Sequence, residues 1–190
     1  KPGLLVSIRT SATVKPDYQQ RAVELARAGV DVIHYAADER GYGPEGKDIP
    51  HISTVIRNIH TAILDAGLRD EATVLASGGV AMAEHVIKAM LCGANAVAVD
   101  LPLLVALECR VCRNCRDGGE CPVDIAGVDP SWASYRMVNL MAAWHNQLLE
   151  MMGAMGIREA RRLRGEQGRV MFMEDLERDT FAKLFSQANS

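Results

Sequence analysis

Short apolar segments alternate with amphipathic segments from residue 4 to residue 100, and this alternation constrains the fold more than any other feature of the chain. Apolar, β-branched runs predict strands, and helical periodicity that ends near a glycine predicts the helices between them. The predicted strands are 4–10, 30–36, 72–76 and 96–100, and the predicted helices are 16–28, 51–66 and 81–91. Strands that are apolar on both faces are typical of a parallel sheet covered by helices.

Two parallel α/β architectures fit this alternation: an open doubly wound sheet and a (β/α)8 barrel of the TIM type. The first predicted strand is not followed by a G-x-G-x-x-G turn, which argues against a dinucleotide-binding sheet. The third strand runs into Ser77-Gly78-Gly79, and the fourth ends at Asp100 before a tight loop. Glycines there would let backbone N–H groups approach an anion, although a tight turn without a ligand is the alternative.

The position of these two loops assigns the strands within a barrel. In (β/α)8 barrels the loops after strands 7 and 8 form the usual phosphate site. Four strand–helix units are too few to close a barrel, so we interpret them as strands 5 to 8. The first four strands would then lie upstream of Lys1, and the start without Met, close to a strand, suggests that the chain is cut from a longer one.

Four of the five cysteines lie within thirteen residues, in the spacing C-x2-C-x2-C-x5-C-P: Cys109, Cys112, Cys115 and Cys121. Thiols at successive three-residue steps suit an iron–sulfur cluster. A structural zinc more often uses two separated C-x2-4-C pairs, or pairs mixed with His, and is the second candidate. Disulfides rank third, because no other feature suggests a small secreted protein. We therefore expect these four cysteines to be metal ligands.

Composition excludes some functions. The chain has 21 Lys and Arg against 24 Asp and Glu, a net charge of −3, which argues against a nucleic-acid partner. No apolar run reaches transmembrane length and no signal peptide is visible, so we expect no membrane partner. Clustered rather than paired cysteines suit the reducing cytoplasm.

Beyond Asp100 the pattern changes, and it divides the chain into three parts. Residues 1–107 form the predicted half-barrel, with a short helix at 101–107, and residues 108–128 form the cysteine-rich loop. Residues 129–190 form a predicted helical tail, in which 131–155 is a long Met- and Leu-rich helix and 156–190 is highly charged. Three arginines of the charged part fall on one helical face, and a salt-bridged surface is favoured over a phosphate site: Arg158, Arg161 and Arg162.

Several of these segments resemble one family. VLASGGVAMAEHVIKAMLCGANAVAVD, from Val74 to Asp100, resembles the FMN phosphate-binding region of the (β/α)8 domain of glutamate synthases and their relatives. LLVSIRT resembles the fifth strand of that domain, and VDVIHYAADERGYG resembles its sixth strand and loop. The cysteine loop resembles the one that holds an iron–sulfur cluster after the barrel. The C-terminal tail resembles that of a glutamate synthase-related subgroup.

The resemblance implies FMN and an iron–sulfur cluster, 4Fe–4S or 3Fe–4S, in an oxidoreductase of the glutamate synthase type. It also implies an electron donor such as ferredoxin or an NAD(P)H-linked subunit, with reduction of 2-iminoglutarate to glutamate as one candidate reaction. Arg9 replaces the family's lysine, Asp38-Glu39-Arg40-Gly41 replaces a His-Asp-Gly-Gly segment, and four cysteines replace the usual three. FMN and a cluster are therefore better supported than the substrate.

The resemblance also assigns site residues. Arg9, at the end of its strand, would place a cation beside the pyrimidine end of the flavin, where charge builds on reduction; its alternative is a salt bridge with Asp38 or Glu39. We expect Arg9, Asp38 and Glu39 at the catalytic site. The expected flavin-binding residues are Arg9, Ser77, Gly78, Gly79, Asp100 and Leu101, with capping of the next helix as the alternative for Asp100. His34, in mid-strand, is interpreted as a core histidine.

Overall fold

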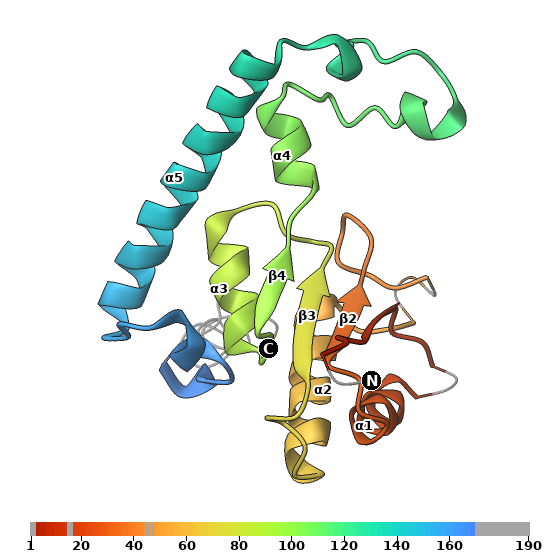
Figure 1. Cartoon of the computed structure of the whole chain (residues 1–190), viewed down its shortest axis with the longest axis vertical. Coiled ribbons are helices and arrows are strands. Elements are labelled where there is room, and N and C mark those ends of the chain that lie inside the picture. The colour runs from red at the N-terminus through yellow and green to blue at the C-terminus, as the bar shows by residue number, and fades with distance from the viewer. Residues whose placement is uncertain (1–2, 15–16, 45, 47, 170–190) are drawn as a thin grey trace, which may run out of the picture.

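Four parallel strands form one sheet in the computed structural model, which describes residues 3–14, 17–44, 46 and 48–169 (Figure 1). The strand order is β1-β2-β3-β4, so each strand pairs with its neighbour in the sequence. Parallel strands in sequence order with a helix between each pair are what one half of a (β/α)8 barrel requires, and the predicted α/β class is confirmed. The strands are β1 Ser7–Thr10, β2 Val32–Ala36, β3 Thr73–Ser77 and β4 Ala96–Ala98.

Three helices connect the strands, and together with the sheet they form what we call the half-barrel: α1 Tyr18–Arg27, α2 Ile52–Asp65 and α3 Ala83–Leu91. Asp17 caps α1 by accepting the N–H of Gln19, and His51 caps α2 by accepting the N–H of Ser53. Both caps satisfy N–H groups that have no partner inside the helix.

The two faces of the sheet have different surroundings. Ile33, Tyr35 and Val74 point to the helices and are at most 1% exposed, where they meet the apolar faces of α1 and α2. Alternate residues point to the other face, which the described helices leave open. The strand register places Arg9, His34, Leu75 and Ala96 in one row across that face. In a closed barrel this row would line the interior.

A buried arginine forms hydrogen bonds with several segments at the end of the sheet where the strands begin. Arg69 is 4% exposed; it donates from Nε to His60 Nδ1 and from Nη1 to the Ala72 carbonyl. Its Nη2 donates to the carbonyl of Gly93 and to Asn95 Oδ1. Burial lowers the pKa of Arg69 to about 10, so the group is still cationic at neutral pH. One side chain thus joins α2 to the starts of β3 and β4.

The C-terminal part lies beside the half-barrel. It comprises α4 Leu101–Ala106, the 3-10 turns η1 Asn114–Asp117 and η2 Ile125–Gly127, and the long helix α5 Pro130–Ala154. A second core joins α3 to α5 and the residues after it: Ile87, Leu91, Met152, Ile157 and Leu163. No helix in the described part of the chain is both long and apolar enough to cross a bilayer.

The helix predicted from residue 156 onward is wrong for the described residues 156–169. Two short 3-10 turns occupy this stretch, η3 Ala160–Leu163 and η4 Gln167–Arg169, because Gly156 and Gly165 adopt positive φ values that an α-helix does not allow. Arg161 pairs with Glu159 there, which agrees with a salt-bridged surface. Residues 170–190 of the predicted tail lie outside the described residues.

Candidate functional site

All four strands point the same way, so the loops that follow them gather at one edge of the sheet (Figure 1). In barrel enzymes this edge carries the active site. A cavity of about 640 Å³ opens there between the ends of β1 and β2. Arg9 and Asp38 both line this cavity, so the structure brings these two predicted site residues together.

Arg9 lies on the open face of the sheet and makes no ion pair with any described residue. The alternative salt bridge with Asp38 or Glu39 is not formed, because both carboxylates have other partners. Among the described residues, the guanidinium thus has no ion-pair partner at the edge of the cavity. A cation in this position could stabilise negative charge on a bound ligand.

His34 is a candidate that the sequence analysis missed. It is the register partner of Arg9, and its Nε2 lies 2.7 Å from Ser77 Oγ. Burial, and then the charge of Arg9, lower the pKa of His34, which favours the neutral imidazole. Interpretation as a core histidine is wrong, because Ile33 and Tyr35 occupy the buried face and His34 must point the other way. Strand alternation in the sequence already carried that signal.

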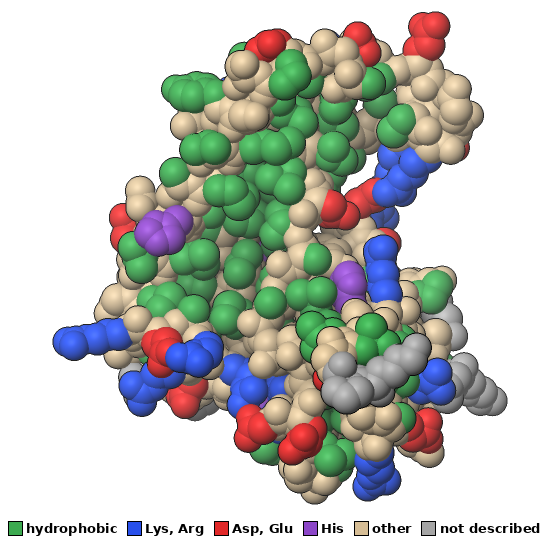
Figure 2. Space-filling model, viewed as in Figure 1, with side chains coloured by type: hydrophobic (Ala, Val, Ile, Leu, Met, Phe, Trp, Pro, Cys, Tyr) green, Lys and Arg blue, Asp and Glu red, His purple; other side chains and the backbone are tan. Residues whose placement is uncertain are grey.

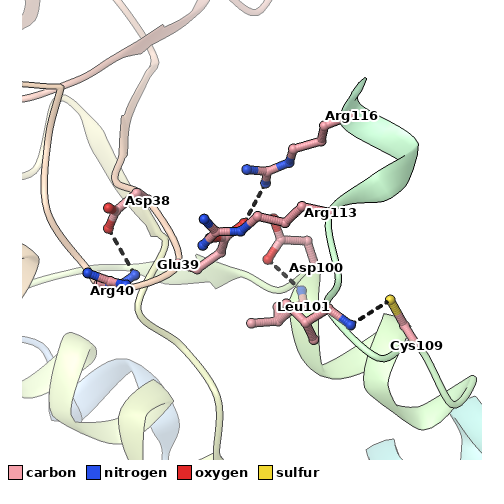
Figure 3. Close-up of polar contacts among 9 residues, drawn as sticks. Asp38, Glu39, Arg40, Asp100, Leu101, Cys109, Arg113 and Arg116 are labelled. Atoms are coloured by element: carbon pink, nitrogen blue, oxygen red, sulfur yellow. Dashed lines mark hydrogen bonds and ion pairs between the residues drawn. The ribbon is translucent and has the colours of Figure 1, made fainter. Parts of the chain in front are cut away.

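Asp38 shapes its own loop. Its Oδ1 accepts the backbone N–H of Arg40 at 2.9 Å (Figure 3). The same oxygen accepts the backbone N–H of Tyr42, also at 2.9 Å. The next glycine, Gly41, has φ +85°, and a Cβ there would lie 2.2 Å from the His51 ring. This tight loop holds Asp38 at the cavity while its carboxylate is engaged with backbone.

Glu39 points away from the cavity toward the cysteine loop. Its Oε1 lies 2.5 Å from Arg116 Nη2, and its Oε2 pairs with Arg113 (Figure 3). The side chain of Glu39 is only 21% exposed. The structure therefore separates Asp38 and Glu39, which were expected at one site.

Ser77, Gly78 and Gly79 form a tight turn at the end of β3. Gly78 and Gly79 have φ values of +90° and +68°. A Cβ on Gly78 would lie 2.3 Å from the Ala37 carbonyl oxygen, and one on Gly79 would lie 2.9 Å from Gly41 Cα. Neither glycine N–H donates a hydrogen bond to any described residue. Unpartnered N–H groups in a turn of this kind are suited to an anion such as phosphate.

Asp100 caps the short helix after β4. Its Oδ1 accepts the N–H of Leu101 at 2.6 Å, which is the capping role that we weighed against flavin binding (Figure 3). Leu101 is the first residue of α4. Both residues also line a small cavity of about 90 Å³ under the cysteine loop.

The cysteine segment, residues 108–128, is the most exposed part of the site. Cys109 is half-buried and the other three thiols are exposed. Cys109 and Cys115 line the small cavity with Asp100 and Leu101. Among the described residues, no group of three or more Cys, His, Asp or Glu side chains converges on a point where a metal would bind.

The chemistry of this segment nevertheless fits a thiolate-ligated metal centre. Cys109 Sγ accepts the Val111 N–H at 3.4 Å. Backbone N–H groups of Ile125, Val123 and Asp124 lower the pKa of Cys121. N–H groups directed at sulfur are a means by which proteins stabilise cluster thiolates. The four described non-glycine residues with positive φ also lie here: Glu108, Val111, Arg113 and Asp124.

The sequence is similar to those of known proteins. The family model for the conserved region in glutamate synthase matches residues 6–158. An archaeal glutamate synthase [NADPH] of Archaeoglobus fulgidus is 34% identical over 167 residues, which cover 80% of this chain and 33% of that protein. The corresponding protein of Methanocaldococcus jannaschii is 32% identical, over 78% of this chain and 32% of its own length. The chain thus spans about a third of the curated relatives that it matches.

Solved structures extend the comparison to the fold alone. The flavin-binding domain of baker's yeast flavocytochrome b2 matches with a TM-score of 0.58 and 15% identity, over 94% of this chain and 40% of that one. A mandelate oxidase variant matches with a TM-score of 0.58 and 20% identity, over 85% and 38% of the two chains. The half-barrel thus has the fold of a portion of these larger chains.

Proposed function

The chain belongs to the glutamate synthase family, and on this basis we propose that it forms the C-terminal half of the FMN-binding barrel, with the iron–sulfur loop, of a glutamate synthase-type oxidoreductase. FMN would supply hydride and single-electron chemistry, and a 4Fe–4S or 3Fe–4S cluster would exchange single electrons with it. The substrate would be a small oxidised molecule, such as 2-iminoglutarate, which is reduced to glutamate. The relatives' name supports NADPH as the ultimate donor, directly, through a linked subunit or through ferredoxin.

The proposal rests chiefly on the unpartnered N–H groups of Gly78 and Gly79, at the same edge of the sheet as the cysteine segment. The turn fits a flavin phosphate because the two glycines leave no side chain between the backbone and an anion. Arg9 would face the pyrimidine end of the flavin from the neighbouring cavity. The His34–Ser77 pair would contribute a neutral polar surface between them.

A completed barrel requires a partner for this half. β1 and β4 are the two edges of the sheet, and one sheet face is open. Figure 2 shows apolar side chains gathered over the part of the molecule that contains α4 and α5. The exposed large apolar residues of these two helices are Leu104, Val105, Trp132, Tyr135, Val138, Met141 and Leu149. Open strand edges and apolar patches of this kind invite association. We propose that the other barrel half, in the same or a separate chain, covers the open sheet face.

Metal and flavin analysis of the anaerobically purified full-length protein tests this function. We expect iron, acid-labile sulfide and FMN in the same preparation, and NADPH- or ferredoxin-dependent reduction of 2-iminoglutarate. Stoichiometric zinc without sulfide would instead support the structural zinc site. A colourless protein without FMN or metal would instead support the alternative that the chain is a non-catalytic interaction module.

The free thiols of the cysteine segment favour a reducing compartment such as the cytoplasm.

A further inference from the structure

Glu39 supplies both ion pairs that join the cysteine segment to the half-barrel in the described part of the chain. It lies in the loop after β2, whereas Arg113 and Arg116 are more than seventy positions further along. The connection is therefore made by the tertiary fold and not by local sequence. These ion pairs link the exposed cysteine segment to the edge of the sheet where the strands end (Figure 3).

Local geometry directs both guanidinium groups to one carboxylate. Arg113 has φ +66° and immediately precedes the 3-10 turn η1, in which Arg116 follows three residues later. The Arg116 N–H donates to the Arg113 carbonyl at 2.8 Å, and this turn keeps the two residues close together, so that both side chains reach Glu39. Each oxygen of Glu39 accepts from a different arginine. Charge-assisted hydrogen bonds of this kind are stronger than neutral ones, and the carboxylate is largely shielded from water.

The ion pairs of Glu39 lie next to the small cavity of about 90 Å³, which is lined by residues of both the cysteine segment and the half-barrel side. Cys109 and Cys115 line it from the cysteine segment, and Asp100 and Leu101 line it from the start of α4. Cys115 lies between the two arginines in the sequence. Fixing Arg113 and Arg116 therefore fixes a thiol relative to the loop that follows the last strand.

We propose that Glu39 is a positioning residue that sets the distance between the thiolates of the cysteine segment and the flavin site. The role rests on the proposed function, because this distance affects electron exchange only if a flavin and a cluster bind on its two sides. Glu39 is not among the proposed ligands of either group. Its carboxylate holds the segment closed over the edge of the sheet.

The test compares Glu39→Gln with Glu120→Gln in the anaerobic full-length protein. Both variants remove one negative charge near the cysteines, but Glu120 makes no ion pair among the described residues. In Glu39→Gln we expect hydrogen exchange of residues 109–121 to be about tenfold faster, since a charge-assisted contact is lost. We also expect a slower electron exchange between flavin and cluster and a changed EPR spectrum, with iron and sulfide retained. Glu120→Gln should match the wild type.

Charge reversal supplies the rescue. Glu39→Arg alone should have the larger defect, and Glu39→Arg with Arg113→Glu and Arg116→Glu should restore slow exchange and the EPR spectrum, because the network is re-formed with opposite signs. Wild-type behaviour of Glu39→Gln, or equal defects in Glu39→Gln and Glu120→Gln, would overturn the proposal. If the wild-type protein contained no iron, the proposed cluster would be refuted instead. The hydrogen-exchange rates of residues 109–121 in the two variants would then still show whether Glu39 holds the cysteine segment in place.

Discussion

The half-barrel and the cysteine segment are held in shape in opposite ways. In the half-barrel, helices and strands enclose apolar residues such as Ile33, Ile56 and Ile63, each 0% exposed. In the cysteine segment no residue is buried. One of its residues, Val111, has a positive φ of +53° although its side chain is β-branched. A β-branched residue in the left-handed region is strained, and such strain persists only where surrounding interactions impose it. The half-barrel therefore has a buried apolar core of its own, whereas the cysteine segment has none, and we expect a bound metal to stabilise this segment.

The largest expected effect comes from removing one thiol. Cys112→Ser should abolish most bound iron and sulfide and increase hydrogen exchange across residues 108–128, because a ligated metal would be the main restraint on this segment. Exchange in β2 and β3 should hardly change. Cys92→Ala, at a buried cysteine of the half-barrel, is the matched control and should keep its iron. Equal metal content in the two variants would contradict the difference between the regions.

A core truncation should show the reverse pattern. Ile59 is 0% exposed on α2, and Ile59→Ala should lower the free energy of unfolding by roughly 2–5 kcal/mol through lost burial and a residual cavity. Leu64→Ala, on the same helix at 55% exposure, should change it by less than about 0.5 kcal/mol. Denaturant unfolding measures both values. Iron content per folded molecule should be unaffected, and a parallel loss of iron would show that the two regions are not independent.

Gly79→Val tests the flavin turn. The valine would be strained at φ +68° and would place Cβ 2.9 Å from Gly41 Cα, so FMN affinity should fall about tenfold or more. Gly29→Val is the control, because Gly29 has a similar φ of +77° but open space around it and lies far from the edge that carries the site. Flavin titration of the apoprotein gives both constants. Unchanged affinity in Gly79→Val would remove this turn from the flavin site.

The smallest effect is a gain. Val111→Gly should relieve the positive φ and stabilise the folded cysteine segment by about 1 kcal/mol, seen as slower iron release to a chelator. Val128→Gly, at φ −64°, should instead speed release, because it adds flexibility without relieving strain. If both variants released iron faster, the conformation of Val111 would not be a strained one that the segment maintains.

The half-barrel could be predicted from the sequence better than the packing of the cysteine segment. All four strands were predicted in order because periodicity and glycine stops are local signals, although the first was predicted to begin at residue 4 and begins at Ser7. Leu4 and Leu5 are 64% and 76% exposed, so apolar character there does not mark pairing in this sheet. The orientation of His34 followed from the same alternation and was overlooked.

Contacts between distant segments could not be predicted. Nothing near Glu39 in the sequence shows that its carboxylate meets Arg113 and Arg116, because that contact depends on how the cysteine segment packs against the sheet. The capping of α4 by Asp100 was one of two predicted roles, and a hydrogen bond to Leu101 supports it. Ligation by the four cysteines stays a prediction.

The network of Arg69 has a consequence for how proteins of this kind diverge. It ties α2 to the starts of β3 and β4, at the opposite end of the sheet from Arg9, Gly79 and the cysteines. Lysine could not reproduce it, because four acceptors in several directions require the fork of a guanidinium. The loops at the other edge of the sheet can therefore vary in sequence without weakening this network. We expect relatives that have exchanged their substrate or electron donor to retain an arginine at this position.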